Sequence, residues 1–313
     1  MDTLLSLTAP VFIVIGLGWA GAKWAIVPIE AARALNAYVF TFAMPALIVR
    51  TLGRQPADSL VEPRFFAAWF VVGLSLFGIG ALITRIAFKD TAGGLAVAGQ
   101  AASVGNIGFL GVPLVLEAFG PEAAGPLALA LTVDLIVLIP LSILILEAQR
   151  EDRRGLGGAT LALKGAILNP FLLSIIAGLG LALMGVQLPG PADRTMAFLG
   201  AAAGPTALFA LGLSLAGRRA EGDLGPSLTL VALKLLVHPA ALMLAMAALG
   251  VDPGPAAVGL VLASLPVAGN VFVIAERYGT RARRASTAVV LSTIIAVGTV
   301  TIAIEFAGGW SGS

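Results

Sequence analysis

The sequence predicts an all-α polytopic membrane protein in which ten transmembrane helices form two inverted repeats of five. Three observations lead to this fold class. The 313 residues are 58% hydrophobic and only 12% charged, which is outside the range of soluble domains. Lysine and arginine concentrate in alternate loops, and the same Pro and Gly positions recur at a nearly constant offset. At about 20 residues per membrane span, a chain of this length holds about ten helices.

Apolar runs separated by short turns define the expected spans. They lie at 4–25, 31–53, 65–87, 92–118, 122–147, 163–185, 193–217, 226–249, 254–278 and 283–307. The longest connection divides the chain into a first five-helix repeat, 1–147, a cytoplasmic linker, 148–162, and a second inverted repeat, 163–313. Because the start of the chain lacks the basic segment of a signal peptide, we expect the first apolar run to be retained as a helix.

The distribution of positive charge predicts the orientation. Loops after odd-numbered spans hold 14 of the 19 Lys and Arg residues, and loops after even-numbered spans hold four. By the positive-inside rule the odd loops are cytoplasmic, so both termini lie on the outer, periplasmic side of a bacterial inner membrane. Arg50 and Arg54, near the outer end of the second span, are expected at the level of the lipid headgroups.

An internal repeat supports the division into two halves. Pro10 and Pro170 lie 160 residues apart, as do Pro45 and Pro205. Because each half contains an odd number of spans, the second copy must be inverted relative to the first. Inverted repeats of this kind are typical of secondary transporters.

The fourth expected span contains residues that break a helix at membrane depth. Gly105, Gly108 and Pro113 lie within nine residues of one another. Glycine tolerates non-helical angles, and proline removes a backbone donor. Non-helical backbone in a membrane occurs only where protein or a water-filled cavity covers it. Ser103 and Asn106 add polar groups at the break without the cost of a buried charge.

The ninth expected span repeats this pattern, with Pro266 and Gly269 directly before Asn270. An unwound segment frees amide donors at the start of the following half-helix, whose positive dipole end attracts an anion. We therefore predict that both breaks bind substrate, through Ser103, Gly105, Asn106, Gly108, Pro113, Pro266, Gly269 and Asn270. In the alternative interpretation the glycines permit close helix packing and the asparagines hydrogen-bond across helices.

Three ionisable residues inside spans are candidates for ion coupling. Asp134 lies in the middle of the fifth span, where a carboxylate is costly and faces the bundle interior. It is a proton or sodium relay, a contact that holds the two broken helices where they cross, or a structural hydrogen bond to a neighbouring helix. Lys234 and His238 share one face of the eighth span. Lys234 either pairs with Asp134 or attracts substrate, or else extends along the helix to the interface. His238 either carries a coupling proton or bonds carbonyls freed by Pro239.

Three segments resemble the auxin efflux carrier family. Residues 106–114 resemble the fourth-helix motif of that family, residues 265–279 its ninth-helix motif, and residues 42–47 its second helix. In this comparison Asn106 and Pro113 match the first motif and Pro266 the second. The sequence has Gly105 where the plant motif usually has a crossover proline. It also lacks the long cytosolic loop of the plant carriers, so it resembles a bacterial-type member.

The resemblance implies a ten-helix fold with a scaffold domain and a transport domain, in which helices 4 and 9 are broken and cross. This is the architecture of sodium/proton antiporters and bile-acid symporters. It also implies transport of organic anions such as auxin or, in bacterial members, dicarboxylates like malonate. One domain would carry the site past the other in an elevator-like movement, and the family resemblance suggests a homodimer.

The expected function is therefore secondary transport of a small organic anion by alternating access, with the substrate held where helices 4 and 9 cross. The alternative is a proton- or sodium-coupled symporter or antiporter in which Asp134 is the coupling residue. The single histidine and the absence of cysteine leave no usual catalytic or metal-ligand set, so we expect no enzyme, no metal and no cofactor. A net charge of +2 does not indicate nucleic-acid binding. Membrane lipid is the other expected partner.

Overall fold

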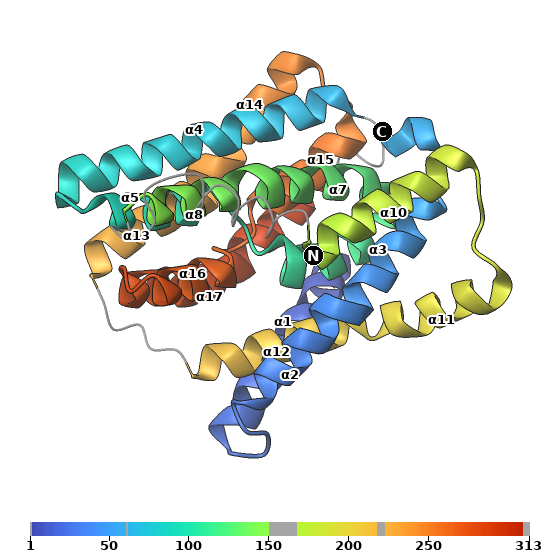
Figure 1. The fold of residues 1–313 in the computed structure, drawn as a ribbon, viewed down its shortest axis with the longest axis horizontal. Coiled ribbons are helices and arrows are strands. Elements are labelled where there is room, and N and C mark those ends of the chain that lie inside the picture. Colours follow the sequence, from blue (N-terminus) through green and yellow to red (C-terminus); the bar gives the residue numbers. More distant parts are fainter. Residues whose placement is uncertain (1, 61, 150–167, 218–222, 309–313) are drawn as a thin grey trace. The chain divides into compact units, whose positions relative to one another are not determined.

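The computed structural model describes residues 2–60, 62–149, 168–217 and 223–308. These residues form helices joined by short turns, and the part of the chain that is described contains no β-strand, only one isolated β-bridge. Figure 1 shows the helices in chain order. The linker expected at 148–162 lies almost wholly outside the described residues.

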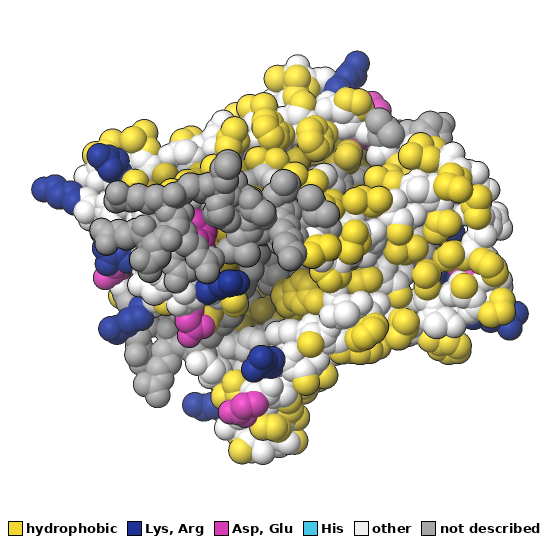
Figure 2. All heavy atoms as spheres, viewed as in Figure 1, with side chains coloured by type: hydrophobic (Ala, Val, Ile, Leu, Met, Phe, Trp, Pro, Cys, Tyr) yellow, Lys and Arg dark blue, Asp and Glu magenta, His cyan; other side chains and the backbone are white. Residues whose placement is uncertain are grey.

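Six helical segments among the described residues are long and apolar enough to cross a membrane. They are Ala31–Gly53, Pro63–Phe88, Pro121–Glu147, Gly190–Ala216, Leu224–Leu249 and Ala282–Gly308. Shorter apolar helices are Ala9–Lys23, Ile107–Phe119, Pro170–Met184 and Pro253–Ala263. Large hydrophobic side chains are exposed, including Phe198 and Leu244, and yellow hydrophobic atoms cover much of the face in Figure 2. The prediction of an all-helical, polytopic membrane protein is confirmed.

Contacts among the helices divide the chain into two compact units. Unit 1 comprises Met1–Pro63, Gly108–Leu129 and Leu168–Arg218, and unit 2 comprises Arg64–Ile107, Ala130–Ile167 and Arg219–Ser313. Each unit takes segments from both expected repeats. The expected substrate residues are shared between the units as well, because the division falls between Ile107 and Gly108.

Unit 1 is built from helices of the first, second, sixth and seventh expected spans, from the later part of the fourth and from the start of the fifth. Its elements are α1 (Asp2–Lys23), α2 (Ala31–Tyr38), η1 (Val39–Ala43), α3 (Met44–Gly53), η2 (Ala57–Leu60), α6 (Val112–Phe119), η4 (Pro121–Ala123), α10 (Pro170–Met184), α11 (Gly190–Ala201) and α12 (Ala203–Ala216). The π-helical turn η3 (Ile107–Gly111) and the helix α7 (Ala124–Val133) each begin in one unit and end in the other.

Unit 2 holds the third, fifth, eighth, ninth and tenth expected spans and the start of the fourth. Its elements are α4 (Pro63–Phe88), α5 (Ala92–Ser103), η5 (Asp134–Leu138), α8 (Ile139–Glu147), α13 (Leu224–Ala232), η7 (Leu233–Val237), α14 (His238–Leu249), α15 (Pro253–Ala263), α16 (Gly269–Arg277) and α17 (Ala282–Gly308). The fourth and ninth expected spans are not continuous: helix stops at Ser103 and at Ala263 and resumes at Ile107 and at Gly269.

Glycines set the close packing of helices within unit 1. A Cβ atom added to Gly212 of α12 would lie 2.0 Å from the carbonyl oxygen of Ile15 in α1, so only glycine allows these backbones to touch. A Cβ on Gly178 of α10 would lie 2.8 Å from Leu52 Cβ in α3. In a membrane no hydrophobic force drives helices together, and small residues at the contacts allow the close approach that packing requires.

Unit 2 packs its helices around aromatic and small residues. Phe65 and Trp69 of α4 are buried and stack with ring centroids 6.0 Å apart. A Cβ added to Gly99 of α5 would lie 2.7 Å from the ring of Phe77, which brings α5 tightly against α4. This packing holds the end of α5, and with it the first helix break, in a fixed place within the unit.

Each of four π-helical turns ends two residues before a proline. The turns are η1, η3, η5 and η7, and the prolines are Pro45, Pro113, Pro140 and Pro239. The residue between turn and proline donates its N–H to the carbonyl five residues earlier in three of these turns, at Met44, Ile139 and His238. A wider turn removes the clash between the proline ring and the preceding carbonyl. The sequence analysis did not anticipate these turns.

A buried carboxylate in the loops of unit 2 is enclosed by two arginines. Asp90, whose side chain has no exposed surface, accepts hydrogen bonds from Arg281 Nε, at 2.8 Å, and from Arg284 Nη1. Arg284 Nη2 also donates to Asp223 Oδ2, at 2.8 Å. We call Asp90, Asp223, Arg281 and Arg284 the closed cluster. Its charges sum to zero, and it fixes the loops that precede α5, α13 and α17 to one another.

Candidate functional site

The two interrupted helices of unit 2 meet through their backbones. The N–H of Asn106 donates to the carbonyl of Pro266 at 2.8 Å, and the N–H of Ala268 donates to the carbonyl of Val104 at 3.2 Å. Gly105 and Val267 between them form an isolated antiparallel bridge. We call residues 104–106 and 264–268 the crossover. The paired extended segments satisfy backbone groups that the breaks would otherwise leave unbonded inside a buried region.

The half-helix α16 presents an open N-terminus at the crossover. Ala268 occupies the N-cap position in an extended conformation, and no side chain caps the helix. The first N–H groups of a helix have no partner within it, and the helix dipole makes this end positive. Asn270 lies in the first turn, and its Oδ1 atom is buried with no hydrogen-bond partner among the described residues. Donors at this end can receive a carboxylate.

Polar groups of the first break lie on the other segment of the crossover. Asn106 is buried, and its backbone N–H donates to the carbonyl of Pro266. Its side-chain amide can supply a donor and an acceptor to a ligand. Ser103 is also buried, but its hydroxyl donates to the carbonyl of Gly99 at 2.9 Å. Ser103 can only accept a further hydrogen bond, so it is a weaker candidate for an anion than Asn106.

Lys234 reaches the crossover from η7. It is fully buried, and its Nζ donates to the carbonyl of Ala263, the last residue of α15, at 2.6 Å. A cation at a helix C-terminus is favoured by the dipole. A Cβ on Gly105 would lie only 3.2 Å from this Nζ, so glycine leaves the room that the ammonium occupies. The burial excludes the interpretation in which Lys234 extends to the membrane interface.

Asp134 and His238 lie within unit 2 beside the same tryptophan. Asp134 is buried and accepts a hydrogen bond from Trp69 Nε1 at 3.2 Å. The ring centroids of Trp69 and His238 are 5.6 Å apart. Both ring nitrogens of His238 lack a hydrogen-bond partner among the described residues, so a bond to the carbonyls freed by Pro239 is not present.

Gln100 is a residue that the sequence analysis did not single out. It is fully buried in α5, one turn before Ser103, and neither its Oε1 nor its Nε2 has a partner among the described residues. A buried amide without partners is costly unless water, an ion or a ligand completes it. The signal was present, because Gln100 is the only amide between Ala92 and Ser103 in an otherwise small and apolar helix.

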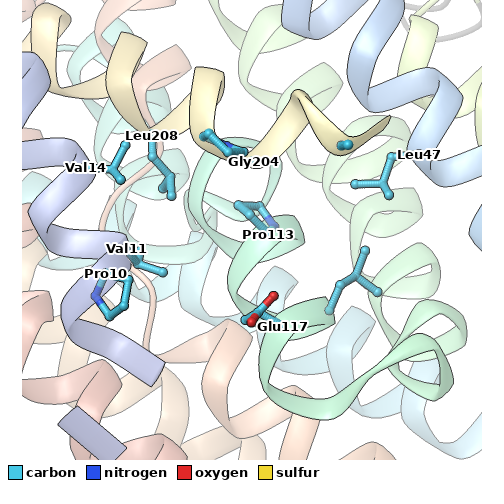
Figure 3. A pocket seen from close by; sticks show the side chains of 11 residues that line it. Pro10, Val11, Val14, Leu47, Pro113, Glu117, Gly204 and Leu208 are labelled. Atoms are coloured by element: carbon cyan, nitrogen blue, oxygen red, sulfur yellow. The ribbon is translucent and has the colours of Figure 1, made fainter. Parts of the chain in front are cut away.

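Two expected substrate residues, Gly108 and Pro113, belong to unit 1. Gly108 lies against the ring of Phe171, since an added Cβ would be 3.5 Å from it. Pro113 lines a cavity of about 380 Å³ with Gly204 and Glu117 (Figure 3). The rest of this lining is apolar apart from backbone, and Figure 3 shows the Glu117 carboxylate on the same helix as Pro113. The cavity can surround a small apolar group.

The side chains of the described residues offer no group of three or more His, Cys, Asp or Glu that would hold a metal ion. In unit 2, the crossover presents neutral amides, the N-terminus of α16 and the side chain of Lys234. This set of donors suits a small anion, which hydrogen bonds and dipoles can hold without a metal.

The chain is similar to known membrane transport proteins over most of its length. Residues 3–304 match the model of the family described as membrane transport protein. The "Putative malonate transporter" of Rhizobium meliloti (strain 1021) is 33% identical over 96% of this chain and 95% of the relative. The "Uncharacterized transporter YfdV" of Escherichia coli (strain K12) is 24% identical over 91% of each chain. The "Auxin efflux carrier component 5" of Arabidopsis thaliana is 22% identical over 92% of each chain.

Proposed function

Because the chain belongs to the membrane transport protein family, which is that of the auxin efflux carriers, we propose that it is a secondary transporter of a small organic anion. Members of this family are transporters and not enzymes. The chain is accordingly a multi-pass membrane transporter.

The observation that carries the proposal is the uncapped N-terminus of α16 at the crossover. Free backbone N–H groups and a positive dipole end attract a carboxylate, and the amide groups of Asn106 and Asn270 add donors. Lys234 provides a positive charge on the same unit, although its hydrogen bond to Ala263 holds it to the α15 end. Neutral donors bind an anion without fixing it so tightly that release becomes slow.

The donors at the helix end and the description of one relative suggest the substrate class. A mono- or dicarboxylate is small enough for the backbone donors at one helix end. Malonate, named in the description of the Rhizobium meliloti relative, is the dicarboxylate we would test first. Auxin-like anions, which combine a carboxylate with a flat apolar body, are the second choice.

We propose that unit 2, which contains the crossover, moves as a rigid body and that unit 1 forms the scaffold. The dense packing of α4 and α5 and the neutral closed cluster support a body that moves without deforming. The proposal includes ten spans in two inverted repeats, both termini on the outer side of a bacterial inner membrane, and an elevator-like movement. A homodimer is part of the same proposal.

A second candidate is coupling to a proton or sodium ion through Asp134. It is favoured by the presence of Asp134, Lys234 and His238 in unit 2, all buried and two of them close to Trp69. A charge inside a membrane protein is expensive, and it marks an ion pathway by default. The alternative is that Asp134 only positions Trp69 and Lys234.

Uptake by purified protein in liposomes tests the function directly. Labelled mono- and dicarboxylates would be supplied with and without imposed pH and sodium gradients. Saturable uptake of one anion supports the proposal, and stimulation by a proton gradient would assign coupling. If no carboxylate is taken up by protein that is folded and correctly inserted, the proposed substrate class is wrong. If neutralising Asp134 leaves gradient dependence unchanged, Asp134 has only a structural role.

The crossover site is tested by substituting its amides. Asn106→Ala and Asn270→Ala should each weaken substrate binding about tenfold, because each removes one or two hydrogen bonds to a charged ligand of roughly 1.5 kcal/mol. Gln149→Ala, which removes an exposed amide after α8 whose Nε2 donates to the carbonyl of Ile145, is the matched control and should bind normally. Substrate affinity would be measured by calorimetry on detergent-solubilised protein. Wild-type affinity in both crossover variants would place the site elsewhere.

A further inference from the structure

A polar pocket in unit 1 is separate from the crossover. It has a volume of about 720 Å³ and is lined by the end of α3, the end of α10 and the start of α11. Its charged side chains are Arg50, Arg54 and Asp193, and Gln55 and Gln187 add amides. We call Arg50, Arg54 and Asp193 the open cluster. All of these residues belong to unit 1, so the pocket is formed within that unit alone.

The open cluster carries a surplus of positive charge. One carboxylate serves two guanidiniums: Arg50 Nε donates to Asp193 Oδ1 at 3.0 Å, and Arg54 Nη2 donates to Asp193 Oδ2 at 2.7 Å. A guanidinium has five N–H donors, and each arginine uses one of them here. The remaining donors have no other partner among the described residues, and 29% of the Arg50 side chain and 56% of that of Arg54 are accessible.

The frame that holds these side chains is stiff. The helices α3 and α10 approach closely, since a Cβ on Gly53 would lie 3.1 Å from Leu181. Gly185, at a φ of 63°, ends α10 in the left-handed conformation and turns the chain, so that α11 begins five residues later. Asp193 lies in the first turn of α11, where the helix dipole favours a negative charge. The carboxylate therefore holds both arginines at the pocket wall.

We propose that this pocket binds an oxyanion, a carboxylate or a phosphate, at a second site that is independent of the crossover. Two guanidiniums anchored by a shared carboxylate present planar pairs of donors, which match carboxylate and phosphate oxygens in bidentate geometry. Asp193 orients the two arginines. It also lowers their affinity for an oxyanion, because its own negative charge competes with the ligand. In the proposed orientation both arginines face the outer side of the membrane.

Two sources supply this chemistry. One is a free dicarboxylate, and the other is the headgroup of an anionic phospholipid. Both would bind through the same donors of Arg50 and Arg54. Neither source requires the crossover to be the transport site, so the inference stands or falls separately from the proposed function.

The test measures oxyanion binding in a background that lacks the crossover amides. Malonate and inorganic phosphate are titrated by calorimetry into Asn106→Ala/Asn270→Ala protein in a neutral detergent. We expect binding to persist, to weaken at least tenfold when Arg50→Gln and Arg54→Gln are added, and to fall as salt increases. Arg64→Gln, which removes an exposed arginine bonded to the carbonyl of Gly250 in unit 2, is the matched control and should bind as before.

A second variant should strengthen oxyanion binding instead of weakening it. Asp193→Asn keeps the shape of the side chain and removes the competing charge, so oxyanion affinity should rise about two- to tenfold. This result is interpretable even if the double arginine variant fails to fold. If malonate or phosphate binds the parent protein, an Asp193→Asn variant that binds it no better would overturn the proposal.

The lipid source is distinguished by its own measurement. Melting temperatures are compared in nanodiscs of phosphatidylcholine and of phosphatidylglycerol. If malonate and phosphate do not bind, but phosphatidylglycerol raises the melting temperature of the parent and not of the double arginine variant, the ligand is the headgroup. If neither soluble oxyanion binds and the lipid effect is the same in both proteins, the pocket is not an oxyanion site and the proposal is overturned.

Discussion

The closed cluster of unit 2 and the open cluster of unit 1 use the same residue types with opposite results. In the closed cluster, two arginines meet two carboxylates, and Asp90 is enclosed so completely that its side chain has no exposed surface. In the open cluster, two arginines share Asp193, and more than half of the Arg54 side chain is accessible beside a cavity. The first arrangement is neutral and surrounds a buried carboxylate, although Arg281 and Asp223 are partly exposed, and the second carries a positive charge beside a cavity.

The difference shows how an ion pair can be assigned to structure or to binding. A buried pair whose charges balance leaves no surplus charge for a ligand, and it contributes by fixing loops that would otherwise separate. A partly exposed pair contributes little to stability, because solvent screens it and its side chains lose entropy. When such a pair also leaves donors free at a pocket, ligand binding explains its arrangement better than stability does.

The largest effect should come from Asp90→Asn. The substitution keeps the size of the side chain but leaves the buried Arg284 without its main counter-charge, and losing one partner of a buried pair costs about 3–5 kcal/mol. Thermal unfolding of the detergent-solubilised protein would show a lower melting temperature. Asp252→Asn, at an exposed N-cap position of α15 where the side chain makes no capping bond, is the matched control. Equal melting temperatures for both variants would show that the closed cluster is not structural.

Two glycine substitutions compare the clusters without changing any charge. A Cβ on Gly94 would lie 2.4 Å from the Asp90 carboxyl carbon, so Gly94→Ala must displace that side chain. Overpacking of this kind costs about 1–3 kcal/mol. Gly190, at the start of α11 near Asp193, has nothing within 4 Å of an added Cβ, and Gly190→Ala should melt close to wild type. The closed cluster would prove adaptable if Gly94→Ala melted as Gly190→Ala does.

Acid should weaken the closed cluster over a defined range. Burial raises the pKa of Asp90. Hydrogen bonds from Arg281 and Thr91 and the charge of Arg284 together lower this pKa by more than burial raises it, so it lies below its ordinary value of 3.8. The contribution of Asp90 to stability is therefore complete above about pH 4, the unfolded value, and is lost as pH falls through the lower folded pKa. The gap in melting temperature between wild type and Asp90→Asn should be constant from pH 7 to 5 and narrow below pH 4. A gap that already narrows at pH 6 would mean that another group controls it.

The sequence predicted the parts of this fold that depend on local composition. Hydrophobic runs and Pro-Gly turns located the helices, and the combination of Gly105 with Pro113, or of Pro266 with Gly269, located the breaks. These signals are local because helix breaking and membrane burial act on neighbouring residues. The family resemblance came from the same motifs.

The sequence could not supply contacts between distant segments. Lys234 bonds the carbonyl of Ala263 and Asp134 bonds Trp69, and no spacing rule identifies such partners. The enclosure of Asp90 depends on arginines about 190 residues away, which only the packing of α5 against α17 brings near. Gln100 was missed because a single amide in an apolar helix is also typical of a satisfied interhelical bond. The π-helical turns depend on how neighbouring helices accommodate each proline.

The smallest effect on stability should come from Asp193→Asn. Asp193 bonds one exposed and one partly exposed arginine, so its ion pairs are screened by water and salt. We expect a melting temperature indistinguishable from wild type in the same detergent in which Asp90→Asn melts early. Oxyanion affinity at the pocket should nevertheless rise, since the arginines lose their internal competitor. A large loss of stability without a gain in oxyanion affinity would show that the open cluster, like the closed cluster, is structural. Exposure and net charge would then not distinguish a binding cluster from a structural one.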